Sequence, residues 1–213
     1  MNVEVSEIFF SIQGESSHAG YPSVFIRLTG CNLRCSYCDT SYAYTAGEEW
    51  TVNGVLRQAR QYRVDRVTVT GGEPLLQEAA VPLVNALEEE GFITLVETNG
   101  TVPLPYQRKF VTVMDIKTPS SGEIAKLYPP NIRRLQAGDE VKFVIGDELD
   151  FKWASAKTRE YRLRERHVEV LFAPVSARLS PRILARWILK EQLAVRLQPQ
   201  WHKVLWPNVV RGA

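Results

Sequence analysis

The chain has 213 residues, of which 45% are hydrophobic and 23% are charged, and these fractions exclude a disordered, collagen-like or coiled-coil protein. It carries 26 Lys and Arg against 24 Asp and Glu, so the net charge of +2 gives no reason to expect nucleic acid as a direct partner. No apolar run approaches the about 20 residues of a membrane span and no secretion signal is visible, so we expect a cytoplasmic protein without membrane contact.

Short, β-branched apolar segments alternate with amphipathic helical patterns along the chain. Strands are predicted, in chain order, at Val3–Phe10, Val24–Leu28, Val67–Thr70, Thr94–Val96, Val111–Ile116, Val141–Ile145, Val168–Phe172 and Ala194–Leu197. Helices are predicted at Thr51–Tyr62, Leu76–Glu90, Leu149–Lys157 and Ser180–Gln192. Thr51 and Ser180 are the predicted N-caps of the first and last helices, because a hydroxyl group can accept a hydrogen bond from the first turn.

This alternation indicates right-handed βαβ units around a parallel sheet. A complete eight-stranded βα barrel typically needs about 250 residues, more than the chain has. We therefore predict an α/β fold, a partial βα barrel of about six parallel strands. No repeat, low-complexity segment or linker divides the sequence, so residues 1–213 are predicted to form one domain.

Polar segments follow several predicted strands, at Gly71–Pro74, Glu97–Gly100, Asp115–Gly122, Ala173–Ser176 and Gln198–Gln200. Gly, Pro, Asn and Ser are ordinary turn residues, so any one of these segments could be a simple turn. In a parallel sheet, however, the carboxyl ends of the strands share the edge where ligands bind. The presence of ionisable side chains in these segments favours a functional site: Glu73, Glu97, Asp115 and Lys117.

The three cysteines, Cys31, Cys35 and Cys38, follow the predicted strand 24–28. An odd and clustered set excludes a disulfide framework. A structural zinc site would need a fourth ligand, and no histidine has the usual spacing. A thioredoxin-like pair at Cys35 and Cys38 would leave Cys31 without a role. A 4Fe–4S cluster on three thiolates leaves one iron open, which suits a reactive centre, and the spacing favours this interpretation.

The spacing Cys-x3-Cys-x2-Cys, with Tyr37 before the last cysteine, resembles the radical S-adenosylmethionine superfamily. The segment Gly71–Pro74 resembles the methionine-binding turn of that superfamily. The resemblance implies a 4Fe–4S cluster on Cys31, Cys35 and Cys38, with S-adenosylmethionine chelating the open iron. It also implies that electron transfer cleaves this cofactor to methionine and a 5′-deoxyadenosyl radical, which abstracts hydrogen from the substrate.

A narrower resemblance covers essentially the whole chain. The segments that are similar to the 7-carboxy-7-deazaguanine synthase family are Glu7-Ile8-Phe9, Ser11-Ile12-Gln13-Gly14-Glu15, Phe25-Ile26-Arg27, Gly30-Cys31-Asn32, Cys38-Asp39-Thr40, Val141-Lys142-Phe143-Val144 and the tail from Trp201 to Pro207. Ser16 departs from the family pattern, in which a glycine often follows Gln-Gly-Glu. The implied reaction is a carbon–nitrogen lyase reaction that converts 6-carboxy-5,6,7,8-tetrahydropterin to 7-carboxy-7-deazaguanine with loss of ammonia, in queuosine and 7-deazapurine biosynthesis.

Site residues follow from this resemblance only where the motifs match. The resemblance implies substrate contacts at Ile12, Gln13, Gly14, Glu15, Arg27 and Thr70. It implies S-adenosylmethionine contacts at Tyr37, Cys38, Asp39, Gly72, Glu73, Ser120, Ser121, Gly122, Ala173, Pro174, Val175 and Ser176, although Val175-Ser176 departs from the family pattern. It implies a Mg²⁺ ligand at Thr40, whose hydroxyl suits a hard cation. A planar guanidinium at Arg27 suits the substrate carboxylate.

The resemblance further implies a homodimer and an electron donor such as flavodoxin or ferredoxin, and it assigns any link to tRNA modification to a later step of the pathway. Residues 1–45 are predicted to carry the substrate clamp and the cluster loop, and residues 46–213 the βα core. No residue is singled out as the group that directs the ring contraction. Two alternative functions stay open: a radical enzyme that activates a partner protein, and a non-catalytic zinc-binding interaction module.

Overall fold

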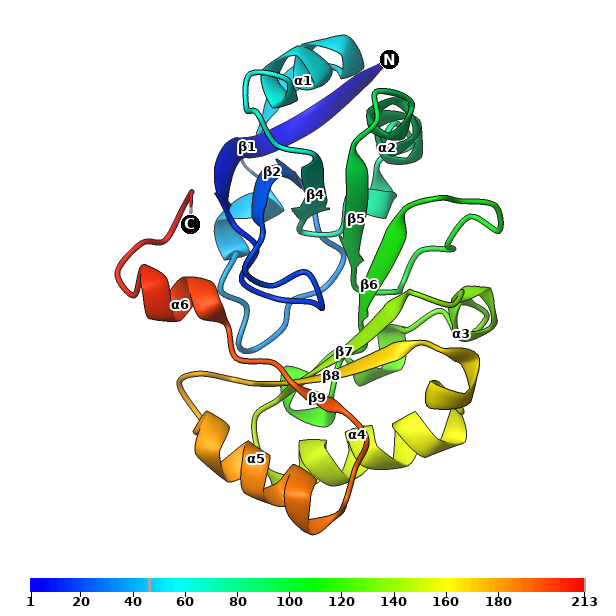
Figure 1. The fold of residues 1–213 in the computed structure, drawn as a ribbon, viewed down its shortest axis with the longest axis vertical. Helices are drawn as coiled ribbons and strands as arrows, with labels where there is room; N and C mark the ends of the chain where they lie inside the picture. Colours follow the sequence, from blue (N-terminus) through cyan, green and yellow to red (C-terminus); the bar gives the residue numbers. More distant parts are fainter. Residues whose placement is uncertain (46, 213) are drawn as a thin grey trace.

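The computed structural model describes residues 1–45 and 47–212. Within them, nine strands form one sheet in the order β3-β1-β2-β4-β5-β6-β7-β8-β9. The strands are β1 (Asn2–Ile12), β2 (Pro22–Leu28), β3 (Glu48–Thr51), β4 (Arg66–Gly71), β5 (Ile93–Thr98), β6 (Val111–Asp115), β7 (Glu140–Ile145), β8 (Glu169–Pro174) and β9 (Arg196–Leu197). The sheet curves around an interior and stays open between its two edges, with helices on its outer side (Figure 1).

The α-helices are α1 (Val52–Ala59), α2 (Ala80–Glu89), α3 (Asn131–Arg134), α4 (Glu148–Glu160), α5 (Pro181–Lys190) and α6 (Trp201–Leu205), and the short 3-10 helices are η1 (Ser41–Tyr44), η2 (Pro74–Leu76), η3 (Pro119–Ser121), η4 (Ile124–Lys126) and η5 (Arg164–Arg166). Both predicted N-caps are confirmed, because Thr51 accepts from the amide of Gly54 and Ser180 from that of Arg182. In the described part of the chain, no helix combines the length and the apolar character that crossing a bilayer requires.

The predicted partial βα barrel is confirmed, but the predicted count of about six parallel strands is too low. Parallel pairings join β2 to β4 and then every strand in turn to β9, which makes seven parallel strands. β1 and β3 add two antiparallel strands at one edge. Segment 48–51 was not predicted as a strand because it is short and polar, and it forms only by pairing with β1.

The predicted helix Leu76–Glu90 begins later than expected. Leu76 belongs to η2, and Gln77 after it has an extended backbone, so α2 begins only at Ala80. The carboxylate of Glu73 accepts from the amide of Leu75 and caps η2. This local cap favours a separate short turn before the helix.

Alternation along the strands gives the sheet an apolar outer face under the helices and an inner face that carries polar side chains. On β4, Val67 and Val69 pack against α1 and α2 in one core cluster. On β7, Val141, Phe143 and Ile145 belong to a second cluster with α4 and α5. The residues between them, of which Thr70 and Lys142 line a cavity, face the interior of the barrel. The helices thus pack on the outer face of the sheet, and the polar side chains on its inner face line the cavity.

Candidate active site

A cavity of about 860 Å³ lies inside the barrel at the carboxyl ends of the strands. This is the edge at which the polar segments of the sequence predicted a site. Its walls include the loop between β1 and β2, the cysteine loop after β2, the inner faces of β4 to β7 and the C-terminal segment from Gln200 onward. In Figure 1, α6 lies at the open side of the barrel, near the loop between β1 and β2.

All three cysteines line this cavity, and each has a free thiol. Burial raises the pKa of Cys31, and it raises the pKa of Cys35 to about 11, so both thiols hold their protons at neutral pH until a cation displaces them. The amide of Leu33 donates to the Sγ atom of Cys31 at 3.4 Å. No three His, Cys, Asp or Glu side chains in residues 1–45 and 47–212 are placed to hold a single ion. Three thiolates on one loop suit a 4Fe–4S cluster, because each thiolate can bind a different iron and the fourth iron stays open.

Gly72 explains how the turn after β4 can approach the cysteine loop. A Cβ atom at this position would lie 2.2 Å from the carbonyl oxygen of Gly30 and 2.6 Å from the Cβ atom of Cys31. Only glycine therefore lets the two loops pack together, with the backbone of the turn facing the cavity. The geometry fits a small ligand that is held beside the cysteines by backbone groups.

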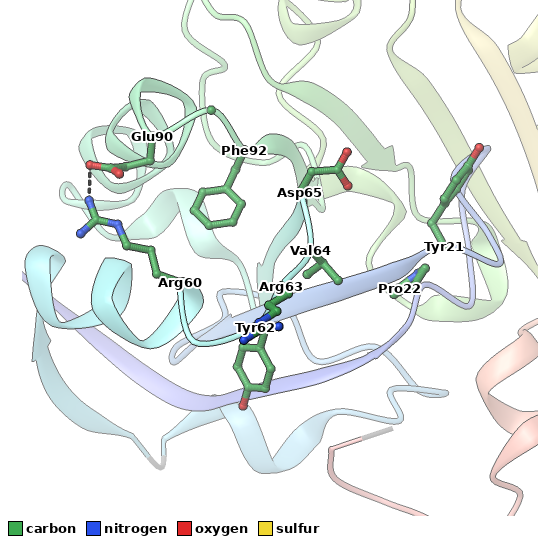
Figure 2. Close-up of a pocket in the computed structure, with 10 residues that line it drawn as sticks. Tyr21, Pro22, Arg60, Tyr62, Arg63, Val64, Asp65, Glu90 and Phe92 are labelled. Carbon is green, nitrogen blue, oxygen red and sulfur yellow. Dashed lines mark ion pairs between the residues drawn. The ribbon is translucent and has the colours of Figure 1, made fainter.

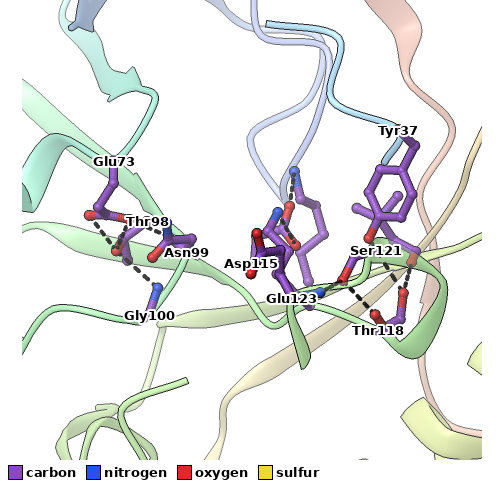
Figure 3. A network of polar contacts seen from close by, with 12 residues as sticks. Tyr37, Glu73, Thr98, Asn99, Gly100, Asp115, Thr118, Ser121 and Glu123 are labelled. Atoms are coloured by element: carbon purple, nitrogen blue, oxygen red, sulfur yellow. Dashed lines mark hydrogen bonds and ion pairs between the residues drawn. The ribbon is translucent and has the colours of Figure 1, made fainter. Parts of the chain in front are cut away.

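Glu73, next in the chain, is buried behind this wall rather than in the cavity. Figure 3 shows its carboxylate beside Thr98 and Asn99: it accepts from the Thr98 hydroxyl at 2.8 Å and from the Asn99 amide at 2.6 Å. Burial raises the pKa of Glu73, although these donors oppose the change. Its side chain fastens the turn after β4 to the end of β5.

The predicted turn Ser120–Gly122 contacts the cysteine loop through its backbone. Ser36 donates its amide to the carbonyl oxygen of Ser121 at 3.0 Å and its hydroxyl to that of Ser120 at 2.7 Å. Tyr37 reaches the same turn, with its hydroxyl 3.4 Å from that of Thr118 (Figure 3). The turn therefore braces the cysteine loop from the outside, while the cavity wall at this point is formed by the loop itself.

The loop between β1 and β2 crosses the interior and is bonded on both sides. Gln13 donates to the hydroxyl of Thr68 at 3.0 Å, and its amide nitrogen lies 3.4 Å from Glu97. On the far side, Glu15 accepts from the ammonium group of Lys142 at 2.5 Å. The amide of Ser17 donates to the buried carboxylate of Glu140 at 3.0 Å. These bonds hold Gln13 and Glu15, two of the predicted clamp residues, in the lining of the cavity.

Two lysines and two carboxylates share the floor of the cavity. The Nζ atom of Lys142 lies 3.2 Å from Asp115, and that of Lys117 lies 3.0 Å from the same carboxylate. Burial alone would raise the pKa of Glu15 and of Asp115, but the neighbouring lysines outweigh it and hold both below their ordinary values. Burial would lower the pKa of Lys142, but Glu15 and Asp115 hold it well above its ordinary value. All four groups are charged at neutral pH.

The C-terminal segment closes one side of the site. The amide of Trp201 donates to the carbonyl oxygen of Gly14 at 3.0 Å, and Lys203 pairs with Asp39 at 2.7 Å. A Cβ atom on Gly14 would lie 2.6 Å from the Nδ1 atom of His202. The tail therefore packs directly on the predicted substrate clamp, and glycine at position 14 makes the contact possible.

Comparison with known proteins gives a consistent result. The model of the radical SAM superfamily matches residues 25–113. A 7-carboxy-7-deazaguanine synthase of Koribacter versatilis is 36% identical over 225 residues, which cover 99% of this chain and 100% of that protein. One from Chlorobaculum tepidum is 38% identical over 214 residues, with 99% and 97% covered. The chain belongs to the 7-carboxy-7-deazaguanine synthase family.

The fold agrees with this family. The crystal structure of QueE from Escherichia coli superimposes with a TM-score of 0.75 over 94% of both chains, at 22% sequence identity. Because the curated relatives match over nearly the whole chain, neither the zinc-binding interaction module nor the enzyme that activates a partner protein is supported.

Within this family framework, the structure gathers most of the predicted site residues but not all of them. The residues that line the cavity are Ile12, Gln13, Gly14, Glu15, Arg27, Cys31, Cys35, Tyr37, Cys38, Asp39, Thr40, Thr70, Gly72, Val175 and Ser176. Those that lie outside its lining are Glu73, Ser120, Ser121, Gly122, Ala173 and Pro174. The second set belongs to the turns and the strand that support the wall.

Several cavity residues were not predicted as site residues. Lys142 lies in the middle of β7, and His202 and Lys203 belong to the tail. A signal for Lys142 was present, since it is the one charged residue of the predicted strand 141–145, where alternation turns it inward. The tail from Trp201 to Pro207 resembles the family, but nothing local in its sequence indicates which surface it covers.

A second hollow, of about 640 Å³, lies near the start of β4 and the end of α2. Figure 2 shows Tyr62, Arg63, Asp65 and Phe92 around it, with Arg60 and Glu90 paired at one side. It contains none of the predicted site residues and none of the cysteines. The predicted site residues that line a cavity all belong to the one inside the barrel.

Proposed function

We propose that this chain is a radical S-adenosylmethionine lyase that converts 6-carboxy-5,6,7,8-tetrahydropterin to 7-carboxy-7-deazaguanine with loss of ammonia, for queuosine and other 7-deazapurines. One observation carries the proposal: the cysteine loop and the clamp residues Gln13, Glu15 and Arg27 open into the same cavity. A cluster without the clamp would suit many radical enzymes, whereas the two together suit a carboxylated pterin.

Cys31, Cys35 and Cys38 would hold the 4Fe–4S cluster, and the backbone beside Gly72 would hold the methionine end of S-adenosylmethionine. When bound, these groups supply a 5′-deoxyadenosyl radical by reductive cleavage of the cofactor. Tyr37–Asp39 would contact the same cofactor from the cysteine loop. Ser120–Gly122 and Ala173–Ser176 would bound the far end of its site, the first by bracing the loop and the second through Val175 and Ser176.

The clamp offers complementary groups for the substrate. A pterin edge presents hydrogen-bond donors and acceptors, which suit the amide of Gln13 and the carboxylates of Glu15 and Glu97. Arg27 would bind the substrate carboxylate with two parallel hydrogen bonds. Thr70 donates its hydroxyl to Glu97 at 2.9 Å and so orients that carboxylate as well as lining the cavity. Ile12 and Gly14 complete the wall around the ring.

Thr40 would bind Mg²⁺ through its hydroxyl group. Its Oγ1 atom lies 3.1 Å from the Oδ1 atom of Asp39, so two oxygen atoms meet at the rim of the cavity. Mg²⁺ prefers oxygen ligands and keeps several waters, which an open rim can accommodate. The substrate carboxylate would then share the ion.

We further propose that the chain acts in the cytoplasm as one domain and as a homodimer, without direct contact to nucleic acid. Residues 1–45 would supply the clamp and the cluster loop, and residues 46–213 the βα core. A flavodoxin or a ferredoxin would deliver the electron. These assignments follow the family resemblance and the absence of any strong net charge.

The test is an anaerobic assay with the reconstituted protein, reductant, Mg²⁺, S-adenosylmethionine and the carboxylated pterin. We expect a brown, iron- and sulfide-containing protein that forms 7-carboxy-7-deazaguanine and one ammonia per turnover. Cleavage of S-adenosylmethionine without formation of the deazaguanine would reject the proposed substrate, but it would agree with the assignment to the radical SAM superfamily. A colourless protein that binds zinc would reject both.

A further inference from the structure

Arg27 is held on three sides by side chains of this chain. Its Nε atom donates to the Oε1 atom of Glu7 at 2.7 Å. Its guanidinium carbon lies 5.7 Å from the ring centre of Phe9 and 5.9 Å from that of Tyr42. The side chains of Arg27 and Glu7 are each only 14% exposed. Arg27 is therefore a fixed group in the cavity wall rather than a flexible arm.

Glu7 joins two of these neighbours. The hydroxyl of Tyr42 donates to the same Oε1 atom of Glu7, also at 2.7 Å. One carboxylate thus holds both the cation and an aromatic ring that stacks on it. Phe9, the other ring beside the guanidinium, stacks in turn on Phe25 with ring centres 4.9 Å apart. Glu7 itself does not line the cavity, whereas Arg27, Tyr42 and Phe25 do.

A β-bulge in β1 brings Glu7 to this place. Val5 pairs with Leu28 and Glu7 pairs with Arg27, so Ser6 is an extra residue without a partner on β2. Before the bulge, Val5 faces the helices, and after it the core-facing position passes to Ile8. Glu7 is thereby turned to the interior, directly opposite Arg27, where cross-strand side chains meet.

The terminal nitrogens of the Arg27 guanidinium form a fork that can still bind a ligand. Arginine has five N–H donors, and the Nε donor is taken by Glu7. Its terminal nitrogens have no hydrogen-bond partner among the described side chains and backbone groups. A fork held at one end and open at the other is the geometry that binds a carboxylate with two parallel hydrogen bonds.

We propose that Glu7 is a positioning residue that fixes the open fork of Arg27, and that it thereby selects pterins that carry a carboxylate over those that lack one. This inference rests on the proposed function, which names the carboxylated substrate. Glu7 would act entirely through Arg27, with Tyr42 completing the hydrogen bonds of the carboxylate. It would not touch the substrate.

The experiment compares wild type with Glu7→Gln, Tyr42→Phe and Arg27→Gln, all as reconstituted holoenzymes. The control is Glu4→Gln, on the same strand with an exposed side chain. For each protein we would measure the Kd for 6-carboxypterin and for pterin itself, and the KM and kcat for 6-carboxy-5,6,7,8-tetrahydropterin. Glutamine at position 7 keeps an acceptor oxygen but removes the charge.

We expect Glu7→Gln to lower the preference for the carboxylated ligand by about tenfold, mainly as a rise in KM. Affinity for pterin and the melting temperature should match those of Glu4→Gln. Tyr42→Phe should move the preference in the same direction by about threefold, and it keeps the inference testable if Glu7→Gln folds poorly. The double variant that combines Glu7→Gln with Arg27→Gln should show the same preference between the two pterins as Arg27→Gln alone.

Two outcomes overturn the inference. One is an equal loss of affinity for both pterins, which marks a structural role for Glu7. The other is an additive effect in the double variant, which shows that Glu7 does not act through Arg27. A wild-type holoenzyme that forms no deazaguanine and does not prefer the carboxylated pterin would reject the proposed function itself, so the two failures are distinct.

Discussion

The ammonium group of Lys142 on β7 lies 2.5 Å from the carboxylate of Glu15, which belongs to the loop between β1 and β2 on the opposite side of the barrel. The contact joins residues 127 positions apart in the sequence. Both residues line the cavity, so the contact spans its interior and holds a predicted substrate group in place. Both side chains are about nine-tenths buried, so neither charge can be satisfied by water alone.

Replacing Lys142 with methionine should be strongly destabilising. The variant leaves Glu15 and Asp115 buried without this cation, which costs about 3–5 kcal/mol of unfolding free energy. Urea denaturation at pH 7 measures the change. Lys152→Met is the matched control, because its pair with Glu148 is exposed and should be worth below about 1 kcal/mol. Equal effects of the two variants would contradict the role of the interior pair.

Glu140 gives a pH dependence with a defined sign. Burial raises the pKa of this carboxyl, so the folded protein binds its proton more tightly than the unfolded chain does. The stability that this proton adds is complete below the ordinary pKa of glutamate and is lost as the pH rises through the folded value.

Glu140→Gln, which cannot ionise, should therefore gain stability relative to wild type as the pH rises from 5 to 8. Paired urea titrations at these pH values measure the difference. Glu169→Gln, at the paired position on β8 with an exposed side chain, is the control and should show a smaller change. A loss of relative stability toward pH 8 in Glu140→Gln would reverse the sign and refute the argument.

Glu73→Gln should weaken cofactor binding, although the side chain of Glu73 lies outside the cavity lining. The carboxylate accepts from two backbone amides and the Thr98 hydroxyl, and a glutamine would direct its own N–H groups at one of these donors. We expect a loss of about 1–3 kcal/mol in unfolding free energy. The affinity for S-adenosylmethionine should fall with it, since the turn with Gly72 loses its attachment to β5. Calorimetry on the reconstituted protein checks this, and unchanged affinity would show that the turn holds its shape alone.

Gly14→Ala should displace the C-terminal tail. The new methyl group would lie 2.8 Å from the backbone nitrogen of His202. Rotation of one side chain cannot relieve this contact, so the backbone of the tail must move. Limited trypsin digestion should cut faster after Lys203, and KM for the pterin should rise about tenfold or more. Gly54→Ala, on the outer helix α1, is the control and should leave the digestion rate unchanged. A tail that resists trypsin equally in both variants would mean that it does not pack on Gly14.

The pattern of the sequence determined the parts of this protein that depend on neighbours along the chain. Thr51 and Ser180 start helices because a hydroxyl caps the first turn wherever the segment lies. Segment 67–70 was predicted as a strand from its β-branched residues, and the structure packs Val67 and Val69 under helices and turns Thr68 and Thr70 inward. The three cysteines lie in one short loop, so their spacing alone indicated a shared ligand.

Only the tertiary structure decided which distant groups meet. Lys142 finds Glu15, His202 covers Gly14, and the bulge at Ser6 sets Glu7 opposite Arg27. None of these follows from a period in the sequence, because the cost of closing a long loop is almost the same for many partners. The choice is made by packing and by the penalty for burying an unpaired charge, and both act only once the barrel has formed.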